Sequence, residues 1–352
     1  MDLHRFRADA RAWLADNKQH APRDYGAILP PDLRDEGVAW QRRLFDAGFA
    51  GLSWPEEHGG RGLSADHQAA WIEEAALAAV PPFINMVGVV LAGGTIQMFG
   101  TPDQQREHLR PIITGDRVWC QLFSEPDAGS DLAGLATRAT NDGDSWVICG
   151  RKAWCSNGRV ADWGILLART DPDAPKHKGI SFFLLDMSLP GIEVRPLRQM
   201  TGGSEFDEVF LDEVHVPADC LLGPLHGGWG VAMATLTNER GHIGAMAISL
   251  GRRLEGATDV ELLTRGRAYQ ALGRRQGSVA GTAASLMKLG ITELLFDLAV
   301  ATADASGAHA MLDGEHTAGL LAAPGGRIAG GTSQIQRNII GELLLGLPRE
   351  PR

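Results

Sequence analysis

The hydrophobic pattern of this chain changes period twice, and this change most limits the folds that it can adopt. Up to about residue 117, apolar side chains recur every three or four positions, which predicts helices with one buried face. Runs such as WGILLART and GISFFLLDM then predict strands separated by turns, before helical spacing returns after a cluster of glycines. We therefore expect an α+β protein with an N-terminal helical domain (1–117), a middle, barrel-like β domain (118–225) and a C-terminal helical bundle (226–352).

Local signals predict where two of the helices lie. Thr101 can cap a helix with its hydroxyl, Pro102 suits the first helical position, and Gln104 completes a capping box. In the last helix, apolar residues from Ile335 to Leu343 recur at helical spacing. We expect this stripe to lie in the core.

The composition disfavours several classes of protein. A hydrophobic share of 44% is typical of globular proteins, and a net charge of -10 disfavours nucleic-acid binding because phosphates are repelled. No apolar run reaches the roughly 20 residues of a membrane helix, and we identify no secretory signal. We therefore expect a cytoplasmic protein. The four cysteines form no C-x-x-C pair and lie at no ligand spacing from histidine, so we expect reduced thiols and no metal site.

Two polar motifs that lie far apart in the sequence indicate a ligand site. SEPDAGSD, from Ser124 to Asp131, follows the strand-like run WCQLF and crowds N–H groups and hydroxyls into one loop, which suits a phosphate or the polar edge of a cofactor. GGTSQIQRN, from Gly330 to Asn338, predicts a helix that begins at Thr332 and directs N–H groups toward an anionic or carbonyl ligand. We interpret the two motifs together, as parts of one site.

With KAWCSN, from Lys152 to Asn157, these motifs resemble those of the acyl-CoA dehydrogenase family, and the resemblance covers nearly the whole chain. That family's flavin loop reads TEPGAGSD, and its next motif is K-x-W-x-[TS]-N. The resemblance implies an FAD-dependent enzyme that introduces a trans double bond between the α and β carbons of an acyl-CoA substrate. It also implies that the flavin lies between the β domain and the C-terminal helices, beside the thioester.

The resemblance assigns residues to both ligands. Trp154 would lie against the flavin ring, and Ser124 and Ser156 would hydrogen-bond its polar edge. The expected cofactor-binding residues are Gln121, Leu122, Ser124, Gly129, Ser130, Trp154, Ser156, Thr332 and Gln334. The expected substrate-binding residues are Ser130, Arg240 and Gly331. Without the resemblance, SEPDAGSD is equally well interpreted as a turn and Trp154 as a core aromatic residue.

The catalytic base departs from the usual pattern of the family. Most members carry a glutamate immediately before the G-T of the last motif, where this chain has Gly330. The α-proton of a thioester is too weakly acidic for a carboxylate alone, so a site must also stabilise the enolate oxygen, and the backbone N–H of Gly330 is still present for this. Some members carry the glutamate on another helix, directly before an arginine matched here by Arg240. We therefore expect Glu239 to be the base, with a pKa raised by apolar surroundings. The alternative is an ordinary solvated carboxylate on a helix.

Two further segments of the family are not found in this chain. Symmetric tetramers of the family hold the flavin of a neighbouring subunit with R-x-x-F-G and Q-x-x-G-G-x-G segments, and neither occurs here. The chain thus resembles the branch in which unlike subunits combine. We expect an oligomer, either a dimer or an α2β2 tetramer with a related partner, and the resemblance implies electron-transfer flavoprotein as the electron acceptor.

Several alternatives remain open at this point. Besides an active dehydrogenase, which we prefer, the chain could be a catalytically silent subunit that completes a partner's site, or an oxidase that returns electrons to oxygen. Glycine at position 330 leaves room beside the acyl group, which suggests a branched or ring-bearing substrate. Six arginines could bind coenzyme A phosphates or a partner, or could form solvated helix faces: Arg252, Arg253, Arg265, Arg267, Arg274 and Arg275.

Overall fold

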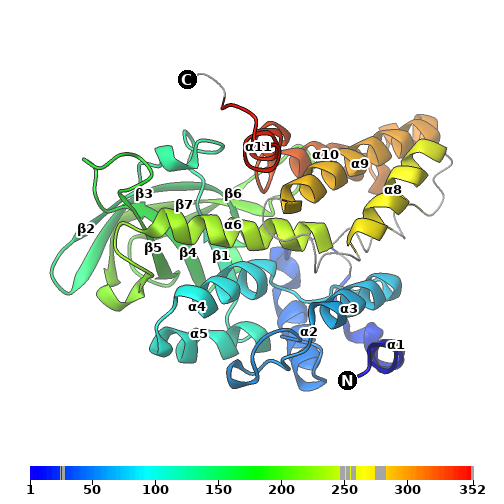
Figure 1. Ribbon diagram of the computed structural model, residues 1–352, viewed down its shortest axis with the longest axis horizontal. Coiled ribbons are helices and arrows are strands. Elements are labelled where there is room, and N and C mark those ends of the chain that lie inside the picture. The colour runs from blue at the N-terminus through cyan, green and yellow to red at the C-terminus, as the bar shows by residue number, and fades with distance from the viewer. Residues whose placement is uncertain are drawn as a thin grey trace.

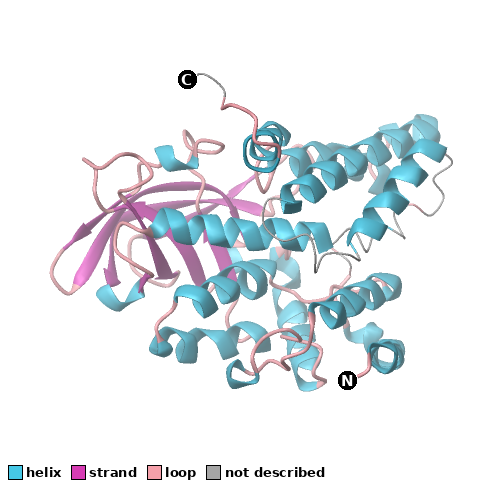
Figure 2. Cartoon of the chain, in the orientation of Figure 1, coloured by secondary structure: helices cyan, strands magenta, loops and turns pink. Residues whose placement is uncertain are grey.

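The computed structural model describes residues 1–23, 25, 28–245, 250, 254, 259–273 and 283–349. Two groups of helices flank one β-sheet, which confirms the α+β architecture expected from the change of period (Figure 1). Figure 2 shows the strands gathered on one side of the molecule and a long central helix, α6 (Gly228–Ala245), running past them toward the other helices. None of the described helices is long and apolar enough to cross a membrane.

The first third of the chain is helical, and its first helix buries Phe6, Ala10 and Leu14 along one face. At the start of a later helix, Thr101 and Gln104 form the expected capping box, with reciprocal backbone-to-side-chain hydrogen bonds of 3.2 and 3.0 Å. The helices are α1 (Leu3–Asn17), α2 (Arg34–Asp46), α3 (Ala65–Ala78), α4 (Gly93–Phe99) and α5 (Pro102–Thr114), with 3-10 turns η1 (Lys18–His20), η2 (Pro31–Leu33) and η3 (Glu56–His58) and a π-helical segment η4 (Val87–Ala92).

The middle third forms one eight-stranded sheet in the order β6-β7-β3-β2-β4-β5-β8, with β1 paired in parallel to β4. Among the described strands, β6 and β8 are the edge strands of this sheet. The elements are β1 (Trp119–Leu122), β2 (Arg138–Asn141), β3 (Ser145–Ser156), β4 (Trp163–Arg169), β5 (Ile180–Asp186), β6 (Ile192–Leu197), β7 (Phe206–Pro217) and β8 (Leu221–Leu222), with 3-10 turns η5 (Leu132–Gly134), η6 (Gly158–Val160) and η7 (Ala218–Cys220).

Strand β4 is apolar on both faces because each face packs on a different core. Ile165 and Leu167 point into the core shared with the helices, whereas Leu166 and Ala168 point into the core within the β domain. This alternation follows from the two-residue period of a strand. The helices therefore cover one face of β4, and side chains from other strands of the sheet cover the opposite face.

The last third is helical again, and Leu254, Leu262, Ile291 and Leu294 form its own core. Its elements after α6 are α8 (Val260–Gly273), α9 (Ala283–Ser306), a 3-10 turn η10 (Gly307–Met311), α10 (Glu315–Ile328), α11 (Ser333–Ile339) and a π-helical turn η11 (Ile340–Leu344).

The expected core stripe on the last helix is wrong. Leu343 is 65% exposed, and the buried residues of α11 are Ser333 and Gln336. The physical reason is that α11 turns a polar face toward α9, where the Ser333 hydroxyl donates a 2.6 Å hydrogen bond to Glu293.

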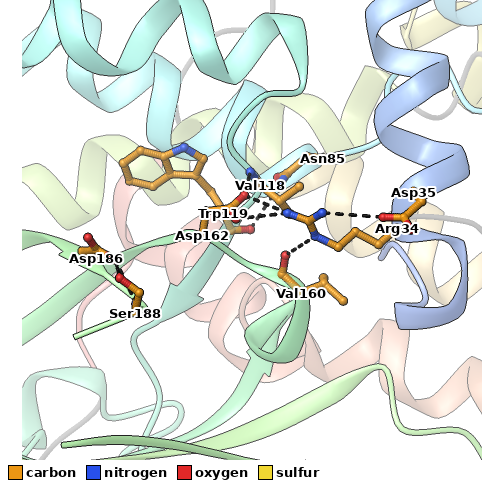
Figure 3. Close-up of polar contacts among 9 residues, drawn as sticks. All are labelled: Arg34, Asp35, Asn85, Val118, Trp119, Val160, Asp162, Asp186 and Ser188. Atoms are coloured by element: carbon orange, nitrogen blue, oxygen red, sulfur yellow. Dashed lines mark hydrogen bonds and ion pairs between the residues drawn. The ribbon is translucent and has the colours of Figure 1, made fainter. Parts of the chain in front are cut away.

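Arg34, at the start of α2, joins the N-terminal helices to the sheet (Figure 3). Its guanidinium donates to the Val160 carbonyl at 3.0 Å and to both carboxylate oxygens of Asp162 at 3.0 and 3.2 Å. Asp162 also accepts a 2.8 Å hydrogen bond from the N–H of Val118, immediately before β1. This network positions β1, which leads into the first polar motif.

Candidate active site

The loop from Ser124 to Asp131 is held from within by the Glu125 side chain. Its carboxylate accepts hydrogen bonds from the N–H groups of Ala136 and Thr137, at 2.7 and 3.0 Å, and so draws the chain after η5 back under the loop. Glu125 itself is buried, at 7% exposure. The loop therefore has a fixed base, although its tip is exposed.

A buried ion pair connects this loop to the KAWCSN motif. Lys152, which is fully buried on β3, places its Nζ 2.8 Å from Glu125 Oε1 and 3.2 Å from the Phe123 carbonyl. Burial raises the pKa of the Glu125 carboxyl, but Lys152 and the two N–H donors outweigh burial and hold this pKa below its usual range. The two motifs thus form one structural unit, a connection that their separation in sequence does not reveal.

Trp154 lies at an irregularity in β3, where the pairing with β7 shifts between Lys152 and Cys155. Its backbone is left-handed, with φ of 59°, a conformation that costs a non-glycine residue roughly 1–2 kcal/mol. The indole packs edge-on against Phe206 and remains 60% exposed. The strand therefore presents a large aromatic face outward at this point.

The other residues expected around the cofactor lie near this loop and bulge. Ser124 is half-buried and its carbonyl accepts a 2.9 Å hydrogen bond from the N–H of Ala153, whereas Gly129 and Ser130 are exposed. Ser156, two residues after Trp154, is buried. Leu122 is fully buried, and its side chain lies in the β-domain core.

The orientation of these groups fits a flat, hydrogen-bonding cofactor such as the expected flavin. Trp154 offers an uncovered aromatic ring, and Asn157, buried at 4% exposure three residues later, has a side-chain oxygen without a hydrogen-bond partner among the described residues. A buried polar atom without a partner costs free energy unless a ligand or water satisfies it.

Glu239 lies on α6, the helix that contacts η4, α4, β5 and α9. It is 9% exposed, so the alternative of a solvated carboxylate is wrong. Burial raises the pKa of Glu239 to about 7, against the opposing effects of the Arg240 and Lys288 charges and a polar contact with the Gln121 side chain. Burial lowers the pKa of the half-buried Arg240, whereas the Glu239 carboxylate raises it.

The glycine pair before α11 forms a turn that sequence reasoning identified only in part. Gly330 and Gly331 both have positive φ, 64° and 91°, which glycine adopts without strain. Thr332 caps α11 as expected and accepts a 3.2 Å hydrogen bond from the N–H of Ile335, while Gln334 is exposed. Among the described residues, no acceptor is found for the N–H groups of Gly330 and Gly331. This turn therefore offers free amide donors.

Lys288, on α9, is a site residue that sequence reasoning missed. Its side chain is fully buried, and its Nζ donates a 2.7 Å hydrogen bond to the Gly331 carbonyl. Burial lowers the pKa of Lys288 to about 8, against the opposing effects of Glu239 and Glu293. A buried lysine within an otherwise apolar helical stretch, LMKLG, is the only signal in the sequence that could have indicated it.

The structure thus brings Gln121, Glu239, Lys288 and Gly331 together from four separate elements. A buried carboxylate with a pKa close to neutrality suits proton abstraction at physiological pH, and free N–H groups suit an oxygen that gains negative charge. This combination can remove a proton beside a carbonyl group.

The arginines expected as possible phosphate or partner contacts divide into two groups. Arg265 forms a 2.8 Å ion pair with Asp297 on α9, and Arg267 donates to the Gln270 side chain at 3.0 Å. The Arg265 pair therefore joins α8 to α9, whereas the Arg267 contact lies within α8. The other four, Arg252, Arg253, Arg274 and Arg275, lie outside the described residues.

The four cysteines are free thiols, two of them buried. Burial raises the pKa of the Cys155 thiol well above its usual range, so this thiol remains protonated. Within the described ranges, no group of three histidine, cysteine or acidic side chains could hold a metal ion.

Three sequence profiles match nearly all of the chain. They are the N-terminal domain (residues 2–116), the middle domain (120–214) and the C-terminal domain (255–345) of acyl-CoA dehydrogenase. Each profile falls within one of the three parts described above.

Individual proteins match over the full length. Acyl-CoA dehydrogenase IpdE1 of Mycobacterium tuberculosis is 40% identical, over 100% of this chain and 99% of that protein. The structure titled Tcur3481-Tcur3483 steroid ACAD has a TM-score of 0.86 at 27% identity, over 99% of this chain and 100% of the other. The ChsE4-ChsE5 complex from Mycobacterium tuberculosis has a TM-score of 0.78 at 26% identity, over 99% and 98% of the two chains.

Proposed function

Because this chain belongs to the acyl-CoA dehydrogenase family of FAD-dependent oxidoreductases, we propose that it dehydrogenates an acyl-CoA thioester to the trans-2-enoyl-CoA with Glu239 as the base that removes the α-proton. The observation that carries this proposal is the burial of Glu239, which is only 9% exposed. Its carboxylate lies close to Lys288, the side chain that holds the Gly330–Gly331 turn. A carboxylate with a pKa of about 7 is ionised in part at neutral pH and still basic enough to accept a proton.

The second half of the chemistry is assigned to the glycine turn. As the α-proton leaves, negative charge develops on the thioester oxygen, and preorganised N–H donors stabilise it most effectively where water is excluded. The N–H groups of Gly330 and Gly331 have no acceptor among the described residues, which supports this role. Glycine at 330 supplies the donor without the carboxylate that most family members carry there.

The expected cofactor residues keep their roles in this proposal. Trp154 would lie against the isoalloxazine ring, with Ser124 and Ser156 at its polar edge and Thr332 and Gln334 at the start of α11. FAD, when bound, supplies the hydride-accepting chemistry that the side chains of this protein lack. Electron-transfer flavoprotein is the proposed acceptor of the electrons.

We assign a bulky, ring-bearing acyl group to the substrate. Glycine at 330 and a base on α6 leave the side of the thioester next to α11 without a side chain. A structural neighbour with a TM-score of 0.86 is a steroid ACAD by its title, which supports a ring-bearing substrate here.

We also propose that the chain works with a related, unlike partner in an α2β2 assembly. Large apolar side chains are exposed on the C-terminal third, a surface composition that marks interfaces. They are Met311, Leu312, Ile328, Leu343, Leu345 and Leu347. The ChsE4-ChsE5 structure, which the chain resembles along its whole length, is a complex of two proteins.

Anaerobic flavin reduction by a panel of straight, branched and ring-bearing acyl-CoA thioesters tests the reaction. We expect the flavin to bleach with ring-bearing thioesters, and Glu239→Gln to retain FAD but to reduce it at least about 1,000-fold more slowly. Glu261→Gln, an exposed glutamate on α8, serves as the matched control and should behave as the parent. A Glu239→Gln protein that reduces flavin at the parental rate would disprove the assignment of the base.

The same experiment separates the alternatives. No bleaching by this chain alone, together with bleaching by the complex that Glu239→Gln does not slow, would identify a catalytically silent subunit. Rapid reoxidation by oxygen after bleaching would identify an oxidase. Mass measurement after co-expression with a genomic neighbour tests the assembly, and an active, FAD-replete homo-oligomer of this chain alone would contradict it.

A further inference from the structure

Lys288 is a fully buried cation close to Glu239, and the proposed function gives it no part in the reaction. We propose that it is a positioning residue for the dehydrogenation, because its ammonium group holds the Gly330–Gly331 turn by a carbonyl while it opposes the negative charge of Glu239. This inference rests on the proposed function and deepens it. It implies that Lys288 links the glycine turn, which supplies the N–H donors, to Glu239, the proposed base.

The placement of Lys288 requires a structural explanation. Lysine is almost never fully buried unless it is paired, yet Lys288 has no exposed surface. It lies on α9, which contacts both α6, the helix of Glu239, and α11, the helix that follows the glycine turn. The side chain is therefore located where the two halves of the site meet.

Lys288 and Gln336 together hold the carbonyl groups of the glycine turn. Lys288 Nζ holds the Gly331 carbonyl at 2.7 Å, and Gln336 Nε2 holds the Gly330 carbonyl at 3.0 Å. In a trans peptide the carbonyl and the next N–H point in opposite directions. Gln336 thus fixes the peptide that carries the N–H of Gly331, one of the two proposed donors. Lys288 fixes the next peptide, between Gly331 and Thr332, and so holds the C-terminal side of a turn whose two glycines would otherwise have wide backbone freedom.

Two carboxylates, Glu239 and Glu293, act on Lys288, and Glu293 has more positively charged partners of its own. Glu293, on the same helix, already contacts Arg327 at 3.0 Å and Arg337 at 3.6 Å, and accepts the Ser333 hydroxyl. Glu293 is therefore compensated without Lys288.

Glu239 has fewer partners. The groups that act on its carboxyl are Arg240 from α6, Lys288 from α9 and the neutral Gln121 side chain from β1. Loss of the Lys288 charge would leave a buried carboxylate with one cation. Such a carboxylate retains its proton to higher pH.

The pH dependence follows from these contacts. Glu239, with a pKa of about 7, is an effective base only above that pH, and Lys288, with a pKa of about 8, is cationic only below that pH. Both groups are charged only in a narrow interval between the two values. We expect the rate of flavin reduction to rise through the first pKa and to fall through the second.

Two substitutions separate the roles of Lys288. Lys288→Arg keeps a cation and a donor that does not titrate below about pH 12, so the alkaline fall in rate should disappear. Lys288→Met, of similar length, removes both, so the acid limb should move up by about one pH unit or more and the limiting rate should fall at least about 10-fold. Lys178→Gln, an exposed lysine in the loop after β4, is the control and should keep the parental profile.

A substrate-free measurement accompanies the kinetics. Because the folded protein releases the Lys288 proton at about pH 8 and the unfolded chain releases it near the ordinary lysine pKa of 10.5, the parent should gain thermal stability relative to Lys288→Arg over that interval. This comparison uses the FAD-bound protein without any thioester.

The outcomes distinguish this inference from the function beneath it. If the parent reduces flavin but Lys288→Arg keeps the alkaline limb and the stability difference is constant with pH, the role of Lys288 is overturned and the dehydrogenation stands. If no thioester reduces the flavin, the proposed function fails. If Lys288→Met does not fold, Lys288→Arg alone decides.

Discussion

The hydroxyl oxygen of Thr95 on α4 lies 2.7 Å from that of Thr235 on α6, and both side chains are fully buried. Each hydroxyl is also within hydrogen-bond distance of the carbonyl four residues earlier, Leu91 in η4 at 2.7 Å and Val231 in α6 at 2.9 Å. Thr235 lies one turn before Glu239, on the same face of α6. This contact therefore ties the turn that carries the proposed base to the N-terminal helices.

Replacing Thr235 by valine should loosen that connection without changing the volume of the side chain. We expect Thr235→Val to lose about 1 kcal/mol of unfolding free energy and to reduce flavin about 10-fold more slowly, because the base is displaced. Thr237→Val is the matched control, since the Thr237 hydroxyl donates only to Met233 in its own helix among the described residues. Denaturant unfolding and stopped-flow reduction measure the two effects, and equal effects in both variants would contradict this role.

The burial of Glu239 predicts a pH-dependent cost to stability. Its pKa is raised from 4.5 to about 7 on folding, so the unfolded chain releases the proton first as the pH rises. The parent should therefore lose stability relative to Glu239→Gln between about pH 4.5 and about pH 7, by on the order of 3 kcal/mol in total, with no further change above that. Urea unfolding across this range measures the difference. A difference that does not vary with pH would show that Glu239 is not buried as described.

The ion pair of Lys152 and Glu125 should stabilise the first motif far more than an exposed pair does. We expect Lys152→Met to cost about 3–5 kcal/mol, because it leaves the Glu125 carboxylate buried without a counter-ion. Lys176→Met is the control: its pair with Asp131 has the same 2.8 Å separation but both side chains are largely exposed, so less than about 1 kcal/mol should be lost. The double variant Lys152→Met with Glu125→Gln should recover part of the loss, and a loss as small as that of Lys176→Met would refute the argument.

Substitutions of Trp154 can distinguish its contribution to FAD binding from its effect on the stability of the fold. Glycine accepts the φ of 59° without strain, so the FAD-free Trp154→Gly protein should be about 1 kcal/mol more stable than Trp154→Ala. Both variants should bind FAD at least about 10-fold more weakly, because the aromatic surface against the isoalloxazine ring is lost. Fluorescence titration of the FAD-free protein measures this affinity. Unchanged affinity would mean that the indole does not contact the ring.

Patterns within a few residues of the chain predicted most of the architecture. The change of period at about residue 118 predicted the sheet between two helical parts, and the capping residues Thr101 and Thr332 predicted where two helices begin. These signals succeed because hydrophobic periodicity and capping are local properties of the backbone. The stripe from Ile335 to Leu343 failed as a core prediction because periodicity identifies an apolar face but not what covers it.

The sequence by itself determined which family motifs are present and that position 330 carries no carboxylate, because both depend only on the order of residues. Only the tertiary structure placed Gln121 and Lys288 beside Glu239, and Glu125 beside Lys152. These groups come from separate elements, and their burial and pairing, which set their pKa values, depend on how helices and sheet pack. Local sequence patterns do not specify this packing, so the pKa values of the site residues could be inferred only from the tertiary structure.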